Sequence, residues 1–81
     1  DGKNISKDVI TLSNNNIVIS ALKRRNNGAY LIRLYNGSPA KAETELRILN
    51  KKLKIRFGKF EFKTFVFDGK EIFESEDSSI Y

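Results

Sequence analysis

The stretch that decides the fold reads ISALKRRNNGAYLIRLYN and occupies residues 19–36. Two β-rich runs flank a short polar insert, Lys-Arg-Arg-Asn-Asn-Gly, at residues 23–28. Asn and Gly readily adopt the positive φ angles that a tight chain reversal requires. The stretch therefore predicts a β-hairpin. The runs at residues 17–22 and 29–35 are so apolar that we expect both strands to be buried on both faces.

Further strand signals follow at short intervals along the chain. Residues 52–57 alternate strictly, with Leu53, Ile55 and Phe57 on one face and basic residues on the other, which is typical of a half-buried strand. A β-branched run at residues 9–12 predicts a strand near the N-terminus, and residues 71–73, after an Asp-Gly turn, predict a short edge strand. Six or seven such strands indicate an all-β chain, an antiparallel sandwich or small barrel, and we expect a small antiparallel β-sandwich.

Residues 40–49 contain both a helix pattern and a strand pattern. Helix formers are frequent there, and Glu43 and Arg47 have the i,i+4 spacing of a helical ion pair. Read with period two, the same residues alternate between an apolar and a charged face. We favour a strand, because Pro39 and Asn50 leave room for only a short element.

Residues 60–67, FEFKTFVF, predict the last long strand, but their apolar phase slips midway. Phe60 and Phe62 share one face, whereas Phe65 and Phe67 lie on the other. Either a bulge occurs near Thr64, or the second half of the strand is covered on both faces.

The length of 81 residues predicts a single domain, residues 1–81, with an ordered core at about 8–73 and a mobile tail at 74–81. The chain begins with Asp1 rather than Met, which we interpret as a processed product or a piece of a longer protein. No apolar run approaches the ~20 residues of a membrane helix. The lack of Cys and of a secretory signal predicts a cytoplasmic origin.

The composition excludes several kinds of chemistry. The chain has no Cys and no His, so it lacks disulfides, thiolate metal ligands and the commonest general base. No Gly-rich phosphate loop and no Gly-x-Ser-x-Gly motif is present. We interpret the carboxylates as solvated charges and predict no catalytic, cofactor-binding or metal-binding residue. Asn-x-Ser triplets at Asn4 and Asn36 are attributed to chance.

The net charge of +5 is distributed unevenly: residues 1–67 carry +9 and residues 68–81 carry −4. A cluster of basic residues with interleaved aromatics would suit a single-strand nucleic-acid binder; it comprises Lys51, Lys52, Lys54, Arg56, Lys59 and Lys63, with Phe57, Phe60 and Phe62. The alternation places ring and charges on opposite faces, so we assign these three phenylalanines to the core and do not expect nucleic acid as a partner.

Six residues are candidates for contact with a substrate or a neighbouring domain. Five belong to the basic, exposed hairpin tip, and the sixth is the one polar residue of the second hairpin strand; they are Lys23, Arg24, Arg25, Asn26, Asn27 and Arg33. As an ordinary structural residue, Arg33 would pair with an acid on a neighbouring strand, Glu61 or Glu45.

Two sequence motifs resemble those of the C-terminal β-domain of glycoside hydrolase family 38, the α-mannosidases. In that family a strand ending in Leu-Lys precedes a polar tip and a strand reading apolar-apolar-Arg-Leu-Tyr-Asn, here Leu22-Lys23 and residues 31–36. Near its end the family carries an apolar or aromatic residue and then Glu-x-Lys-Thr-Phe, here residues 60–65. The resemblance covers about residues 17–67. Lys59 departs from it, since relatives often have Pro there.

The resemblance implies a non-catalytic β-sandwich domain of a larger enzyme. That enzyme would hydrolyse α-mannosidic bonds with retention, using a carboxylate nucleophile and a zinc ion bound by Asp and His in a separate catalytic domain. None of those residues maps onto this chain, so its partner would be the rest of the parent chain, and an α-mannoside would be met only through the catalytic domain. Two alternatives stay open: a stand-alone carbohydrate-binding or adhesive β-module, and a small basic single-strand binder.

Overall fold

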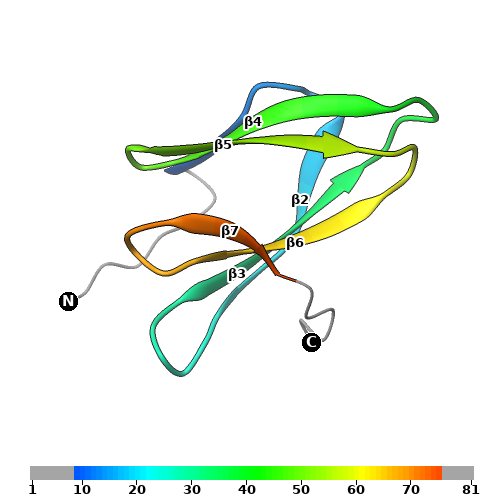
Figure 1. The fold of residues 1–81 in the computed structure, drawn as a ribbon. Coiled ribbons are helices and arrows are strands. Elements are labelled where there is room, and N and C mark those ends of the chain that lie inside the picture. Colours follow the sequence, from blue (N-terminus) through cyan, green and yellow to red (C-terminus); the bar gives the residue numbers. More distant parts are fainter. Residues whose placement is uncertain (1–8, 76–81) are drawn as a thin grey trace.

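The computed structural model describes residues 9–75, which form two antiparallel sheets and no α-helix. The strand order is β1-β4-β5 in one sheet and β2-β3-β6-β7 in the other. The sheets lie over one another as a small all-β sandwich, which confirms the predicted fold class (Figure 1). The strands are β1 (Ile10–Leu12), β2 (Ile17–Arg24), β3 (Tyr30–Asn36), β4 (Ala42–Ile48), β5 (Lys51–Phe57), β6 (Phe62–Phe67) and β7 (Ile72–Ser75). The described part of the chain contains no helix long and apolar enough to cross a membrane.

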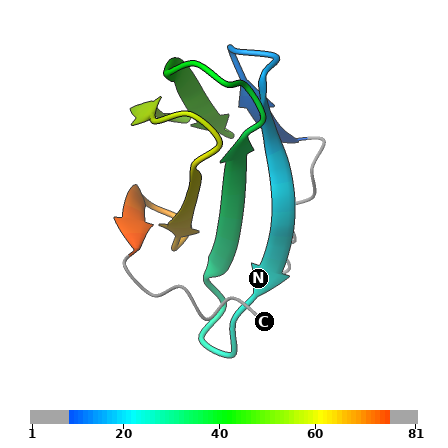
Figure 2. The same cartoon turned by 90° about the vertical axis from the view of Figure 1, so that its right-hand side faces the viewer.

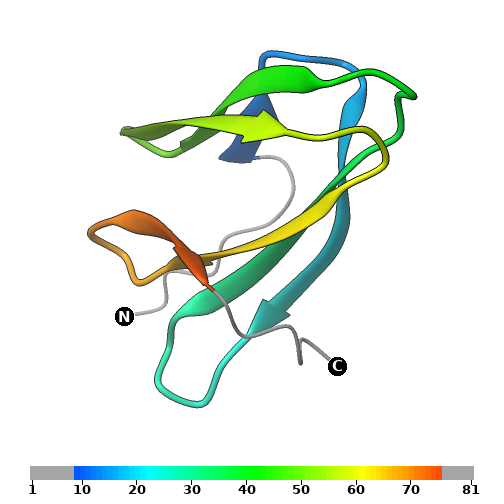
Figure 3. The ribbon, with the colours of Figure 1, turned by 45° about the vertical axis from the view of Figure 1, so that its right-hand side comes forward.

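All three connections between the sheets lie at one end of the sandwich, which we call the crossover end. They join β1 to β2, β3 to β4 and β5 to β6, through residues 13–16, 37–41 and 58–61. The three hairpin turns lie at the opposite, hairpin end (Figure 3). This division follows from antiparallel pairing, because every strand that leaves the crossover end is paired with one that returns to it.

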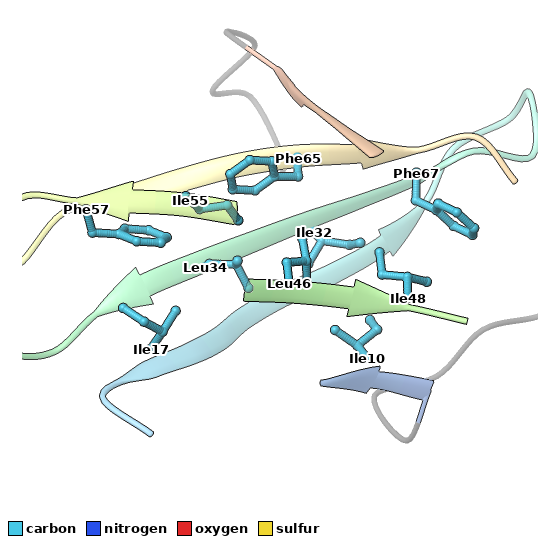
Figure 4. Close-up of a cluster of buried hydrophobic side chains, with 10 residues drawn as sticks. All are labelled: Ile10, Ile17, Ile32, Leu34, Leu46, Ile48, Ile55, Phe57, Phe65 and Phe67. Carbon is cyan, nitrogen blue, oxygen red and sulfur yellow. The ribbon is translucent and has the colours of Figure 1, made fainter. Parts of the chain in front are cut away.

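The core lies between the sheets and takes alternate residues from the facing strands (Figure 4). Every member is aliphatic or a phenylalanine, and the isoleucines suit a pleated surface because they are β-branched. The buried residues of this cluster are Ile10, Ile17, Ile32, Leu34, Leu46, Ile48, Ile55, Phe57, Phe65 and Phe67. Period-two alternation in the sequence thus becomes one apolar layer between two sheets.

Strand β3 is central in its sheet and is buried on both faces over most of its length, as predicted. On its outer face Leu31 packs with Ala29 and Val66 in a second, smaller cluster. The same prediction for residues 17–22 is wrong, because β2 is an edge strand with a neighbour on one side only. Its outer residue Val18 is 48% exposed. Ser20 is the extra residue of a bulge in this strand.

The two ambiguous segments are both resolved as strands. Residues 40–49 contain β4, which pairs with β1 and β5, so the strand reading is confirmed. In β6 the register against β3 runs without a shift, and residues 64–67 are all buried, so the second half is covered on both faces and has no bulge. Phe57 is a core residue, but the assignment of Phe60 and Phe62 to the core is wrong, since each is 52% exposed.

Strand β7 extends through Ser75, so residues 74 and 75 belong to the sheet rather than to the predicted tail. The mobility predicted for the remaining tail concerns residues 76–81, which lie outside the described residues, as do residues 1–8.

Candidate functional site

Asn36, at the end of β3, ties the loops of the crossover end together. Its side-chain Nδ2 donates to the carbonyl oxygens of Ala40 and Gly58, each at 2.9 Å, and its Oδ1 accepts the N–H of Ser38 at 3.0 Å. Its backbone N–H donates to the carbonyl of Glu61 at 2.9 Å. A primary amide supplies two donors and an acceptor, so its side chain is satisfied although fully buried. A buried amide is also inaccessible for glycan attachment, in line with a chance Asn-x-Ser triplet.

The segment 58–61 is a tight turn that holds Phe60 at the surface. The N–H of Glu61 donates to the carbonyl of Gly58 at 3.3 Å, and Glu61 Oε1 accepts the N–H of Gly58 at 2.6 Å. Phe60 has a φ of 51°, in the left-handed region that residues with a Cβ avoid. A turn with positive φ at its third residue normally carries Gly or Asn there.

Three apolar side chains form a row across the outer face of the four-stranded sheet, next to the crossover end. Val18 in β2 pairs with Tyr35 in β3, and Tyr35 pairs with Phe62 in β6. The rings of Tyr35 and Phe62 are stacked, with centroids 4.3 Å apart and an interplanar angle of 27°. We call these three residues the apolar row. Phe60 precedes Phe62 by two residues, in the loop that leads into β6. It is exposed at the crossover end, where it lines a surface hollow with Pro39, Lys41 and Lys59.

Arg33 lies on the same outer face and is bound locally. Its Nε donates to Ser20 Oγ at 3.1 Å, and that hydroxyl donates to the carbonyl of Arg33 at 3.2 Å. Its guanidinium carbon lies 5.1 Å from the centroid of the Phe62 ring, within cation–π distance. The predicted pairing with Glu61 or Glu45 is wrong: Glu45 belongs to the other sheet, and the bulge in β2 brings a hydroxyl to Arg33 instead.

The other five candidate contact residues lie at the tip of the β2–β3 hairpin, at the hairpin end (Figure 2). The structure gathers them and leaves Arg33 apart, within the sheet. All five are exposed: Lys23, Arg24, Arg25, Asn26 and Asn27.

The tip itself is shaped by local bonds. The N–H of Arg25 donates to the carbonyl of Ala29 at 2.7 Å, and Asn27 Oδ1 accepts the N–H of Ala29 at 3.0 Å. Gly28 supplies a φ of 90°, the positive angle expected from the sequence. The guanidinium carbon of Arg24 lies 5.9 Å from the centroid of the Tyr30 ring. The tip is therefore an ordered, basic hairpin end.

Four acidic side chains of the described residues bind groups within the fold: Glu43, Glu61, Asp68 and Glu74. Residues 9–75 contain no group of three or more acidic residues placed to hold a metal ion. Glu43 pairs with Arg56, and Glu74 with Lys63, each at 3.4 Å. The Asp68 carboxylate caps the β6–β7 turn by accepting the backbone N–H groups of Glu71 and Lys70. These hydrogen bonds, that from Glu71 most strongly, hold the pKa of the carboxyl below its ordinary value. The exposed ion pairs Glu43–Arg56 and Glu74–Lys63 contribute little to stability.

The β5 members of the basic cluster do not share a face with the exposed Phe62. Lys52, Lys54 and Arg56 line the outer face of the three-stranded sheet, whereas Phe62 and Tyr35 lie on the outer face of the four-stranded sheet. A single-strand binder needs its stacking rings beside its phosphate-binding charges. Lys52, Lys54 and Arg56 do not meet this requirement with Phe62, whereas Lys59 adjoins the exposed Phe60 and Arg33 lies over the Phe62 ring.

Comparison of the chain with protein-family models, with curated protein sequences and with solved structures gave no match. The candidate site is thus defined by geometry: the apolar row and Phe60. Sequence reasoning missed it because it assigned exposed phenylalanines to the core. A signal was available, since counting in twos from the buried Phe65 and Phe67 places residue 62 on the opposite face.

Proposed function

We propose that the chain is a non-catalytic C-terminal β-sandwich domain of a family 38 α-mannosidase, and that it packs against the rest of that enzyme through the apolar row and Phe60. The two motifs that carry the resemblance support this. The first forms the β2–β3 hairpin and the second forms the turn at residues 58–61 and β6. Strands β3 and β6 pair directly, from Tyr30 opposite Phe67 to Tyr35 opposite Phe62. The residues of the two motifs therefore form one continuous part of the four-stranded sheet.

The observation that carries the proposal is the exposure of the apolar row together with Phe60. Val18, Phe60 and Phe62 are each about half exposed and lie at the same end of the molecule. Exposed apolar side chains gathered at one end of a small domain support an interaction site there.

In this proposal the chemistry belongs to the parent enzyme. The zinc ligands and the nucleophile would come from its catalytic domain, since the chain offers no His. The chain's partner is then the rest of the parent polypeptide, and an α-mannoside is contacted through the catalytic domain. A cytoplasmic location accompanies the proposal because the chain has no Cys.

Two measurements test membership and inertness. The coding sequence on the N-terminal side of Asp1 should encode a catalytic domain with the Asp and His zinc ligands; an unrelated domain there would overturn the proposal. The purified 81-residue chain, incubated with zinc and a chromogenic α-mannoside, should give no turnover. Product above the protein-free blank would contradict a non-catalytic role.

The docking surface is tested in the full-length parent enzyme. Phe62→Ser removes the most exposed ring of the apolar row and should lower the melting temperature of the enzyme and its mannosidase activity. Leu49→Ser is the matched control, because Leu49 is equally exposed, at 53%, but lies at the hairpin end of the other sheet. Equal effects of the two substitutions would show that the row has no special role.

A further inference from the structure

Strand β5 is a free edge of the three-stranded sheet within residues 9–75. On the other side of β4, the N–H of Ser13 donates to the carbonyl of Glu45, and the N–H of Leu49 donates to the carbonyl of Val9. The odd-numbered residues of β4 therefore bond toward β1, and its even-numbered residues bond toward β5.

The register then fixes which backbone groups of β5 are free. Thr44 faces Ile55 and Leu46 faces Leu53, so the odd-numbered residues of β5 are bonded to β4. The backbone N–H and C=O groups of the residues between them point to the open side of the strand. These residues are Lys52, Lys54 and Arg56.

A groove runs beside this edge, between the two sheets. Its apolar lining comes from Leu53, Ile55 and Phe65, and its volume is about 540 Å³. Lys63 and Glu74, an ion pair at 3.4 Å, line it as well, together with Glu43, Lys54 and Arg56. An added strand would place alternate side chains toward this groove and the others over the basic outer face.

The charge of the edge determines what can add to it. Four of the seven residues of β5 are Lys or Arg and none is acidic. Charged edges of this kind discourage association with further strands, which is their ordinary role. Two copies of β5 paired edge to edge would place like charges opposite one another, which is unfavourable. A strand with acidic residues on its outward side meets the opposite situation, since its pairs with Lys52, Lys54 and Arg56 are attractive; of these three, Arg56 also pairs with Glu43 at 3.4 Å.

We propose that β5 binds an extended acidic segment of another polypeptide by strand addition, with main-chain hydrogen bonds to Lys52, Lys54 and Arg56. Apolar residues of the segment enter the groove, and its acidic residues lie beside the basic side chains. The inference does not rest on the family 38 proposal, because it uses a different surface and a different observation.

The test uses the 81-residue chain and fluorescein-labelled peptides, with binding followed by fluorescence anisotropy at low salt. The probe is the octapeptide TEVEVEVT. The comparison peptides are its lysine counterpart TKVKVKVT and TEVEVEVT N-methylated at its second Glu, whose N–H faces β5 in an antiparallel pairing. We expect saturable binding of the first and about tenfold weaker binding or none of the other two. Equal binding of the N-methylated peptide would show attraction by charge alone and would overturn strand addition.

Two variants at one position separate the main chain from the charge. Lys54→Ala removes the charge and keeps the N–H on the free edge, whereas Lys54→Pro removes both and leaves the bonds to β4 in place. We expect Lys54→Pro to bind TEVEVEVT about tenfold more weakly than Lys54→Ala. Equal affinities would contradict the proposal. Circular dichroism checks the fold of both variants, and the result with the N-methylated peptide decides the question independently of them.

Discussion

Leu49 and Phe60 form a matched pair at opposite ends of the sandwich. Their side chains are 53% and 52% exposed, and their φ angles are 56° and 51°. Both residues carry a Cβ in a conformation that favours glycine. The strain is thus local to the backbone and can be measured separately from the loss of the side chain.

We predict that glycine is more stabilising than alanine at both positions. The variants Leu49→Gly and Phe60→Gly should each exceed the corresponding alanine variant by about 1 kcal/mol in unfolding free energy, because only the Cβ differs. Urea unfolding measures the difference. At Lys59, which is not at positive φ, alanine should be the better residue. If the Gly and Ala variants ranked in the same order of unfolding free energy at positions 49, 59 and 60, the strained backbone geometry would be contradicted.

Lys59 is the second residue of the turn at 58–61, the position that proline favours. Within residues 9–75 its N–H has no hydrogen-bond partner. We predict that Lys59→Pro raises the unfolding free energy by about 0.5 kcal/mol, because it restricts the unfolded chain. Lys59→Ala is the control for the lost charge and should change stability little. A lower melting temperature for the proline variant would mean that the turn differs from the one described.

Asn36→Ala should destabilise the chain by about 3 kcal/mol, because it leaves the carbonyls of Ala40 and Gly58 without their buried donors. Asn27→Ala is the matched control: its side chain also binds a backbone N–H, but at the exposed hairpin tip, and its loss should cost less than about 1 kcal/mol. Thermal and urea unfolding measure both. Similar losses of unfolding free energy at the two sites would argue against the role of Asn36 in holding the loops of the crossover end together.

The lowered pKa of Asp68 predicts how its contribution depends on pH. A carboxyl whose pKa is depressed by folding stabilises the folded state above its unfolded pKa, and the contribution disappears as the pH falls through the folded pKa. Asp68→Asn should therefore lower the melting temperature at about pH 7 and have a smaller effect at about pH 2.5. Because the carboxylate is fully exposed, high salt should reduce the difference at neutral pH.

The sequence predicts the architecture well where short-range rules decide it. Pro39 and Asn50 limit β4 to a short element, and Gly28 marks the hairpin tip. Prediction failed where the answer depends on which strand lies beside which. Residues 17–22 look doubly buried until the topology places β2 at an edge, and no local pattern shows that position.

The candidate site was harder to predict than the fold. Phe62 could have been placed outside by counting from Phe65, but the slip in the FEFKTFVF pattern made a bulge equally plausible. Ser20, the partner of Arg33, depends on a bulge that the sequence does not signal. The free edge of β5 also needed the structure, because strict alternation gives the faces of a strand but not its neighbours.

The separation of the crossover end from the hairpin end has a consequence for engineering. The three hairpin turns take no part in joining the layers, so they are natural places for inserted peptides or longer loops. Each could carry a foreign epitope or affinity tag at the same pole of the molecule. Insertions among residues 37–41 or 58–61, by contrast, would interrupt the bonds to Asn36. The domain is thus a display scaffold with one permissive pole and one that must be left intact.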